Sequence, residues 1–161
     1  DSATLFHHCY PEPRRLGVDR WLAMLGGRRH RSGPLLVVDA GTALTVDFLT
    51  VDNHHNGGFI VPGLDLSRQA LWRNTRRVIA YADESEAAVL EPGRDTTGCV
   101  GAGTRRMQRA FVASVVADYP AYYPLITGGD GAWLAHELNL EYLPELVLDG
   151  LDTLCAGYSS H

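Results

Sequence analysis

The sequence predicts an α/β fold in which a run of three strands is followed by helices that alternate with further strands. Three short segments between residues 34 and 61 have the length and apolar pattern of strands, with Gly- and Asn-rich turns between them. Beyond them, helix-length segments with apolar residues at three- and four-residue spacing alternate with two more strand-like segments. The chain has 161 residues, 45% of them apolar, which is enough to bury a core. We therefore expect residues 1–161 to form a single α/β domain.

The first half of the chain is expected to contain a loop, a helix and a β-meander. Residues 1–16 include several prolines and are expected to be irregular. Apolar residues at helical spacing predict a short helix over residues 19–25, and the pair Gly26-Gly27 is expected to end it. The strands of the meander are expected at residues 34–39, 44–50 and 59–61, with turns at 41–42 and 53–58.

The second half of the chain is expected to alternate helices with strands. Apolar periodicity predicts helices over residues 64–78, 96–119, 133–138 and 150–156. Strand-length apolar segments occupy residues 122–126 and 143–148. Residues 82–91 are acidic and weakly patterned. Glycines at 98, 101 and 103 are expected to let the start of the long helix bend or fray.

Composition argues against several classes of protein. The net charge of −5 argues against a nucleic-acid binder, whose footprint is usually a basic face. Three widely spaced cysteines, Cys9, Cys99 and Cys155, suit reduced thiols in the cytosol. No apolar run approaches the roughly 20 residues that span a bilayer, and no signal peptide is visible. We therefore expect a cytoplasmic protein with no nucleic-acid and no membrane partner.

The histidines do not predict a metal site. His7-His8 and His54-His55 are adjacent pairs in predicted loops, so the two members of each pair point in different directions. The helical His/Glu spacing of a zinc site does not occur. These histidines are therefore expected to lie in surface loops.

The segment Asp39-Ala40-Gly41-Thr42 is a candidate phosphate site at the end of a predicted buried strand. Glycine lets backbone N–H groups approach a phosphate closely, and a threonine hydroxyl adds a donor. The Asp39 carboxylate can hold a cation that neutralises phosphate charge. The alternative interpretation is a plain β-hairpin with a polar turn.

The segment Gly17-Val18-Asp19-Arg20 is a second candidate. Its carboxylate could serve as a base, and the arginine fork suits a substrate carboxylate in a bidentate pair. The alternative interpretation is that Asp19 is an ordinary N-cap of the following helix.

Two further turns are candidates for binding a ligand. Thr127-Gly128-Gly129-Asp130 follows a predicted strand, where paired glycines let a ligand lie against the backbone. Gly93-Arg94-Asp95-Thr96 precedes the long helix, where Thr96 could donate to a substrate. The alternative is that Asp130, and Asp95 or Thr96, simply cap helices.

Taken together and in order, six segments resemble the type III pantothenate kinase family. The segments are Tyr10 with Leu16–Ala23, Val37–Asp47, Gly57–Leu64, Gly93–Thr96, Thr127–Asp130 and Leu146–Leu151. They extend from Tyr10 to Leu151, which is nearly the whole chain. The resemblance implies an actin-like ATPase fold built from two ribonuclease-H-like halves, and a homodimer with the pantothenate pocket near the subunit interface.

The resemblance also implies the reaction and the role of each matching residue. It implies ATP-dependent phosphorylation of pantothenate, the first step of coenzyme A synthesis, with Asp19 as the catalytic base. It implies that pantothenate is bound by Tyr10, Gly17, Val18, Asp19, Arg20 and Thr96. It implies that ATP is bound by Gly41, Thr42, Gly128 and Gly129. Asp39 would bind a monovalent cation, K⁺ or NH₄⁺, and Mg²⁺ would accompany the ATP.

The chain departs from the family pattern in one important respect. Family members begin with a half that carries an Asp-x-Gly-Asn-Thr/Ser phosphate motif, and no segment here matches it. The expectation is therefore a C-terminal portion, with the tail of the first half at residues 1–33. Two alternatives to an active pantothenate kinase are a truncated inactive kinase and a non-catalytic actin-like binding or regulatory protein. A third is an actin-like kinase that acts on a different small alcohol.

Overall fold

The computed structural model describes residues 6–82, 84 and 90–158, and its strands form one mixed sheet. The strands are β1 (His7–His8), β2 (Leu35–Ala40), β3 (Ala43–Leu49), β4 (His54–Pro62), β5 (Tyr123–Thr127) and β6 (Glu141–Tyr142). Their order in the sheet is β1-β4-β3-β2-β5-β6. Strands β2, β3 and β4 pair antiparallel, whereas β5 pairs parallel with β2. The α/β class and the β-meander are therefore confirmed.

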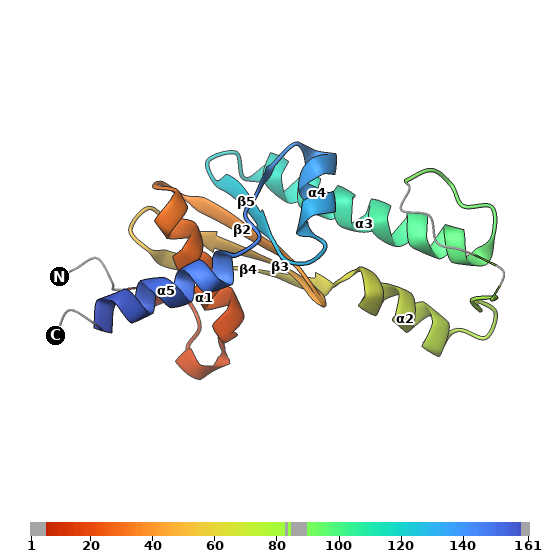
Figure 1. Cartoon of the computed structure of the whole chain (residues 1–161), viewed down its shortest axis with the longest axis horizontal. Coiled ribbons are helices and arrows are strands. Elements are labelled where there is room, and N and C mark those ends of the chain that lie inside the picture. The colour runs from red at the N-terminus through yellow and green to blue at the C-terminus, as the bar shows by residue number, and fades with distance from the viewer. Residues whose placement is uncertain (1–5, 83, 85–89, 159–161) are drawn as a thin grey trace.

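Helices cover both faces of this sheet (Figure 1). They are α1 (Val18–His30), α2 (Leu64–Asn74), α3 (Thr96–Asp118), α4 (Gly131–Leu138) and α5 (Leu146–Tyr158), with a 3₁₀ turn η2 (Pro13–Arg15) before α1. Helices α1 and α5 lie on one face, and α3 and α4 lie on the other. Helix α2 and the first part of α3 project beyond the sheet as an arm, at the opposite end from the two termini (Figure 1).

Strand β2 is the centre of two separate cores. Leu35 and Val37 pack with Met24 of α1 and with Leu146 of α5, whereas Leu36 belongs to the core beneath α3 and α4. All four residues from Leu35 to Val38 are at most 2% exposed. Burial on both faces explains why this strand is a continuous apolar run and not an alternating one.

The prediction that Gly26-Gly27 ends the first helix is wrong, because α1 continues to His30. Both glycines are buried, Gly26 against α5 and Gly27 against the sheet. A Cβ added at Gly26 would overlap the carbonyl oxygen of Leu146, and one added at Gly150 would overlap that of Leu22. The glycines therefore allow the two helix backbones to touch, and they do not act as a stop signal.

Several other predicted boundaries differ from the structure, including that of the helix expected at residues 64–78, which ends at Asn74. The turn expected at residues 53–58 ends at Asn53, whose φ is 63°, because β4 already begins at His54. The strand expected at residues 143–148 is wrong, since β6 ends at Tyr142 and buried Leu146 begins α5 against α1. His7-His8 forms the short strand β1 beside β4 and is not irregular. Residues 1–5 and most of the acidic segment 82–91 lie outside the described residues.

The long helix α3 is continuous despite its three early glycines. Its N-cap is Asp95, whose Oδ1 accepts a hydrogen bond from the Gly98 backbone N–H at 2.6 Å. An aspartate at this position satisfies one of the unpaired N–H groups of the first turn. The expected bending or fraying of this end is therefore not seen.

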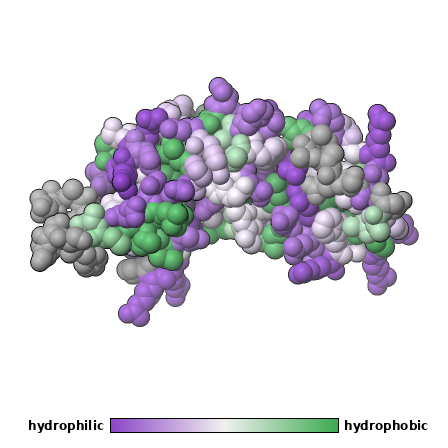
Figure 2. Space-filling model, viewed as in Figure 1, coloured by the Kyte–Doolittle hydropathy of each residue, from purple (hydrophilic) through white to green (hydrophobic). Residues whose placement is uncertain are grey.

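The surface is mixed, with an apolar area over α5 (Figure 2). Leu148 and Leu151 contribute to it and are 57% and 46% exposed. In the described part of the chain, no helix combines the length and the apolar character needed to cross a bilayer.

Candidate active site

Two of the predicted ligand-binding turns meet at one edge of the sheet. The Gly41-Thr42 turn joins β2 to β3, and the Gly128-Gly129 turn joins β5 to α4. The Asp130 N–H donates to the Ala40 carbonyl at 2.9 Å and ties the turns together. Gly128 has a φ of +92° and packs directly against Ala40, so a larger residue would be strained there.

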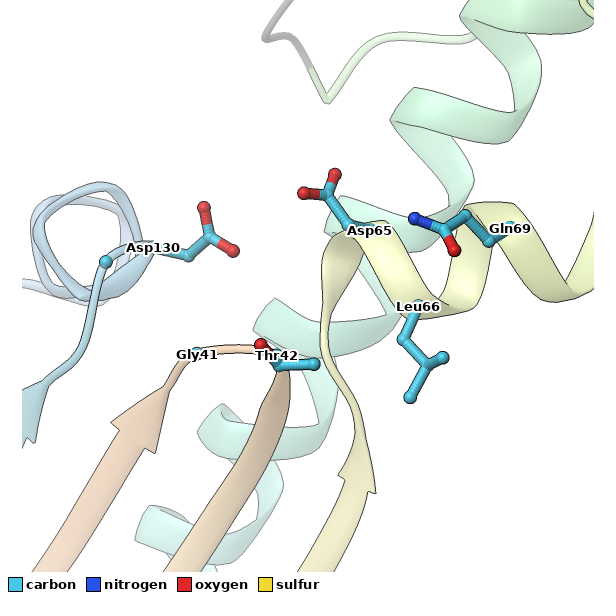
Figure 3. A pocket seen from close by; sticks show the side chains of 7 residues that line it. Gly41, Thr42, Asp65, Leu66, Gln69 and Asp130 are labelled. Carbon is cyan, nitrogen blue, oxygen red and sulfur yellow. The ribbon is translucent and has the colours of Figure 1, made fainter. Parts of the chain in front are cut away.

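A pocket of about 470 Å³ opens over these turns. It is lined by Gly41, Thr42, Asp65, Leu66, Gln69, Gly129 and Asp130. Figure 3 shows the Asp65 and Asp130 carboxylates pointing toward one another above the turn. Three of the four residues expected to bind ATP therefore line one pocket, and Gly128 lies behind them against Ala40 and Asp39.

The sequence reasoning missed the contribution of α2 to this pocket. The Gly63 N–H donates to the Thr42 carbonyl at 2.9 Å, which holds the start of α2, including Asp65, beside the turn. Asp130 occupies the N-cap position of α4, one of the two interpretations of its turn, but its side chain makes no capping hydrogen bond. The Pro-Gly pair before α2 was the sequence signal for the close approach, but it did not indicate which turn α2 would meet.

Asp39 lies between this pocket and the start of α1. Its carboxylate is half-buried, and no described residue donates a hydrogen bond to it or forms an ion pair with it. Burial raises the pKa of Asp39, and the negative charges of Asp19 and Asp47 raise it further. The carboxylates of Asp19, Asp39 and Asp47 therefore lie near one another, and no described positive group pairs with Asp39.

Asp19 is exposed in the first turn of α1. It is not the N-cap, because Gly17 occupies that position. Its Oδ1 accepts a hydrogen bond from the Arg20 backbone N–H at 2.9 Å. A negatively charged group in the first turn lies at the positive end of the helix dipole, which is a favourable position for it.

Arg20 is buried and fully oriented by neighbours that the sequence did not reveal. Its Nε and Nη2 donate to the two oxygens of Asp47 at 2.9 and 2.5 Å, and Nη1 donates to the Tyr10 hydroxyl at 2.9 Å. The side-chain hydrogen bonds raise the pKa of Arg20 above its already high ordinary value. The guanidinium of Arg20 was expected to pair with a substrate carboxylate, but it makes its bidentate pair with Asp47.

His55 contradicts the expectation of a surface loop histidine. It is 1% exposed in β4, and its Nε2 lies 2.8 Å from Asp47 Oδ1. Its ring stacks on Tyr10 with centroids 6.0 Å apart, and its Nδ1 lies 3.9 Å from Cys9 Sγ. The pairing of β4 with β3 sets this position, since the register places His55 opposite Leu49.

Thr96 is not brought to the other predicted substrate residues within one chain. It is the first residue of α3, at the outer end of the arm (Figure 1). There it lines a separate pocket of about 500 Å³ with Arg77, Val78, Gly93, Arg94, Asp95, Cys99 and Val100. Within the described residues, no three His, Cys, Asp or Glu side chains gather in a way that could hold a metal ion.

Comparisons with known proteins indicate a family. The family model for type III pantothenate kinase matches residues 1–118. Type III pantothenate kinases of Alcanivorax borkumensis and Ectopseudomonas mendocina are 44% and 42% identical to the chain, over 92% and 91% of its length. The chain spans 62% of the length of each of these relatives.

A solved structure is also similar to the chain. It is described as a conserved Baf family transcriptional activator from Campylobacter jejuni. Its TM-score is 0.67 at 25% identity, and the match covers 98% of this chain and 70% of that one.

Proposed function

The chain belongs to the type III pantothenate kinase family, and from that premise we propose that it carries the site of an ATP-dependent pantothenate kinase. The reaction would transfer the γ-phosphoryl group of ATP to the primary hydroxyl of pantothenate, the first step of coenzyme A synthesis. One observation carries the proposal. Asp39 has the family-matched acceptor residue Asp19 near it on one side and the glycine turns of the nucleotide pocket on the other.

The acceptor side of the site would be formed by the start of α1. Phosphoryl transfer needs positioning and charge neutralisation more than a strong base. The exposed carboxylate of Asp19 is suited to orient the pantothenate hydroxyl and to accept its proton as transfer proceeds. Tyr10, Gly17, Val18 and Arg20 would bind the remainder of pantothenate.

The nucleotide side of the site would be the pocket over Gly41, Thr42, Gly128 and Gly129. Backbone N–H groups in such turns, and the threonine hydroxyl, are suited to phosphate oxygens. Asp65 and Asp130 face this space, and oxygen ligands of this kind are those that Mg²⁺ takes together with ATP phosphates. A magnesium ion that enters with ATP would neutralise charge on the transferred group.

Asp39 suits a monovalent cation, K⁺ or NH₄⁺. A half-buried carboxylate without a donor, next to two other negative charges, is stabilised in its ionised form by a bound cation. Asp39 would supply one oxygen ligand, and the cation would offset negative charge between acceptor and nucleotide.

A homodimer would account for the position of Thr96. An apolar groove of about 700 Å³ runs between α2 and α3 and includes Leu71, Val100 and Met107. Paired across a two-fold axis, the arms of two copies would cover this groove and carry Thr96 toward the partner's substrate pocket. Mixing a Thr96→Ala variant with an Asp19→Asn variant should then restore about a quarter of wild-type activity, because half of the dimers are hybrids with one intact site. Failure to restore activity in exchanged dimers would show that Thr96 acts within its own chain.

The fold and the domain assignment extend the same proposal. An antiparallel meander followed by parallel strands, with helices on both faces, is consistent with a ribonuclease-H-like half of an actin-like ATPase. We assign residues 34–161 to the second half and residues 1–33 to the tail of the first. A second candidate function is a non-catalytic regulatory protein, which the similarity to a Baf family transcriptional activator favours.

The test is ADP release by the full-length protein with ATP, Mg²⁺, K⁺ and pantothenate. Asp19→Asn should lower kcat by about 100-fold or more, which is the usual contribution of a positioned base. Asp52→Asn, an exposed aspartate in the β3–β4 turn, is the matched control. An unchanged rate for Asp19→Asn would remove the base assignment. Turnover of a different alcohol would favour another actin-like kinase. Turnover of no alcohol would favour the regulatory protein.

A further inference from the structure

Asp47 is the centre of a buried polar cluster formed by four segments of the chain. It lies on β3 and is 1% exposed, and it accepts hydrogen bonds from Arg20 of α1 and His55 of β4. Tyr10, which follows β1, completes the cluster by accepting from Arg20 and stacking on His55. A buried carboxylate is tolerated only when such donors satisfy it.

The hydrogen bonds define which atom of each group donates. Burial alone would raise the pKa of Asp47, but the hydrogen bonds from His55 and Arg20 outweigh it and hold the pKa below its usual value. Both oxygens of the ionised carboxylate accept, so the network assigns the His55 proton to Nε2.

The same logic directs the Tyr10 hydroxyl. Its oxygen accepts from Arg20 Nη1 at 2.9 Å, so its own proton points elsewhere and is available to a ligand. Arg20 has committed Nε and Nη2 to Asp47 and cannot rotate without breaking that pair. The cluster therefore leaves the Tyr10 proton and the Nη1 edge of Arg20 as its donors toward a substrate.

We propose that Asp47 and His55 are positioning residues for pantothenate binding, an inference that rests on the proposed function. Asp47 fixes the plane of the Arg20 guanidinium, and His55 holds Asp47 through Oδ1 while its ring stacks on Tyr10. Neither residue touches pantothenate. They act by holding Tyr10 and Arg20 in one orientation. Replacing Asp47 or His55 should therefore weaken pantothenate binding and leave nucleotide binding unchanged.

The experiment compares Michaelis constants for the two substrates in the full-length protein. Asp47→Asn should raise KM for pantothenate by about 10- to 100-fold, the usual effect of losing a charged hydrogen bond, while KM for ATP stays within about 2-fold. Asp52→Asn, whose side chain is exposed, is the matched control and should change neither constant. Equal rises in both constants, or none, would overturn the positioning role.

A second pair of variants keeps the inference testable if Asp47→Asn folds poorly. His55→Gln retains a donor near the Nε2 position, whereas His55→Leu retains bulk without a donor. His55→Leu should raise KM for pantothenate by about 10-fold, and His55→Gln should remain within about 3-fold of wild type. Equal values for these two variants would mean that the hydrogen bond to Asp47 does not position the site.

A double-mutant cycle tests whether Asp47 acts through Tyr10. In a Tyr10→Phe background, Asp47→Asn should raise KM for pantothenate by clearly less than its effect of about 10- to 100-fold in the wild type, because the Tyr10 donor is already lost and only Arg20 remains to be misoriented. Fully additive effects would contradict this route. Absence of pantothenate turnover by the wild-type protein would instead overturn the proposed function, and this inference with it.

Discussion

The helix pair α1–α5 and the helix pair α2–α3 solve the same packing problem in opposite ways. In the first, Gly26 and Gly150 bring the two backbones into contact. In the second, the helices leave an apolar groove of about 700 Å³, with Leu71 and Met107 substantially exposed along it. A completed interface and an open one are therefore built into the same chain.

The contrast indicates where the chain is self-sufficient and where it needs a partner. Helix α1 carries Asp19 and Arg20, so these groups stand on a support that the chain completes by itself. Helix α3 carries Thr96 on the open arm, where an exposed apolar groove is a candidate interaction site. Asp19 and Arg20, which we propose to bind pantothenate, should thus be positioned within one copy, whereas the proposed role of Thr96 should depend on association.

The strongest way to break the comparison is to separate α1 from α5. Gly26→Ala would force a methyl group into the Leu146 carbonyl, so we expect a loss of about 3 kcal/mol or more in the free energy of unfolding. Urea denaturation followed by circular dichroism measures it. A loss below about 1 kcal/mol would mean that the two helices can move apart cheaply.

A substitution in the groove between α2 and α3 should change the dissociation constant of the dimer and not the stability of the fold. Met107→Glu places a charge in the groove and should weaken the dimer by about 2 kcal/mol, or roughly 30-fold in Kd. Sedimentation velocity over a dilution series measures it, and Ala117→Glu, exposed on the last turn of α3, is the control. If Met107→Glu left the dimer unchanged, the interface would lie elsewhere on the molecule. If the wild type were monomeric, the proposed dimer would be wrong.

A smaller effect is expected on the pH dependence of thermal stability, through Asp39 near the start of α1. The pKa of Asp39 is raised in the folded state. The contribution of Asp39 to stability is therefore fully present below the ordinary aspartate pKa of about 4 and is lost as pH rises through the raised value. Asp39→Asn should therefore melt about 2–4 °C higher than wild type at pH 7, with no difference below pH of about 4. Thermal melts from pH 3 to pH 8 check this, and added KCl should stabilise only the wild type.

The smallest effect concerns a glycine on the open arm. No atom lies within 4 Å of a Cβ added at Gly103, so Gly103→Ala should stabilise the protein by about 0.5–1 kcal/mol through helix propensity alone. The measurement is the same urea titration used for Gly26→Ala. Destabilisation would show that the groove is closed by a partner that needs the glycine.

The elements that the sequence predicted well are those with a local signal. The β-meander followed from apolar runs and glycine turns, and the Gly41-Thr42 turn was located correctly. The helix predicted for this region was too short because Gly26 packs against Leu146, which is 120 residues further along the chain, and does not end the helix. No local pattern reveals such a partner.

The site divides in the same way. Gly41, Thr42 and Gly129 could be identified from their turns, and the pocket contains them. His55 and Asp47 were missed because their contact depends on how β3 pairs with β4, and Asp65 because it depends on where α2 begins in space. Side chains whose role comes from long-range pairing carry no signature in the sequence itself.

The two backbone hydrogen bonds at the Gly41-Thr42 turn also have a mechanical consequence. Ala40 accepts from Asp130 at the start of α4, and Thr42 accepts from Gly63 at the start of α2, so the starts of both helices are held at one short turn. Helix α2 has 11 residues and thus a length of about 16 Å. A tilt of about 10° at its root would sweep its far end through about 3 Å. A change at the Gly41-Thr42 turn that tilted α2 would therefore alter the groove between α2 and α3.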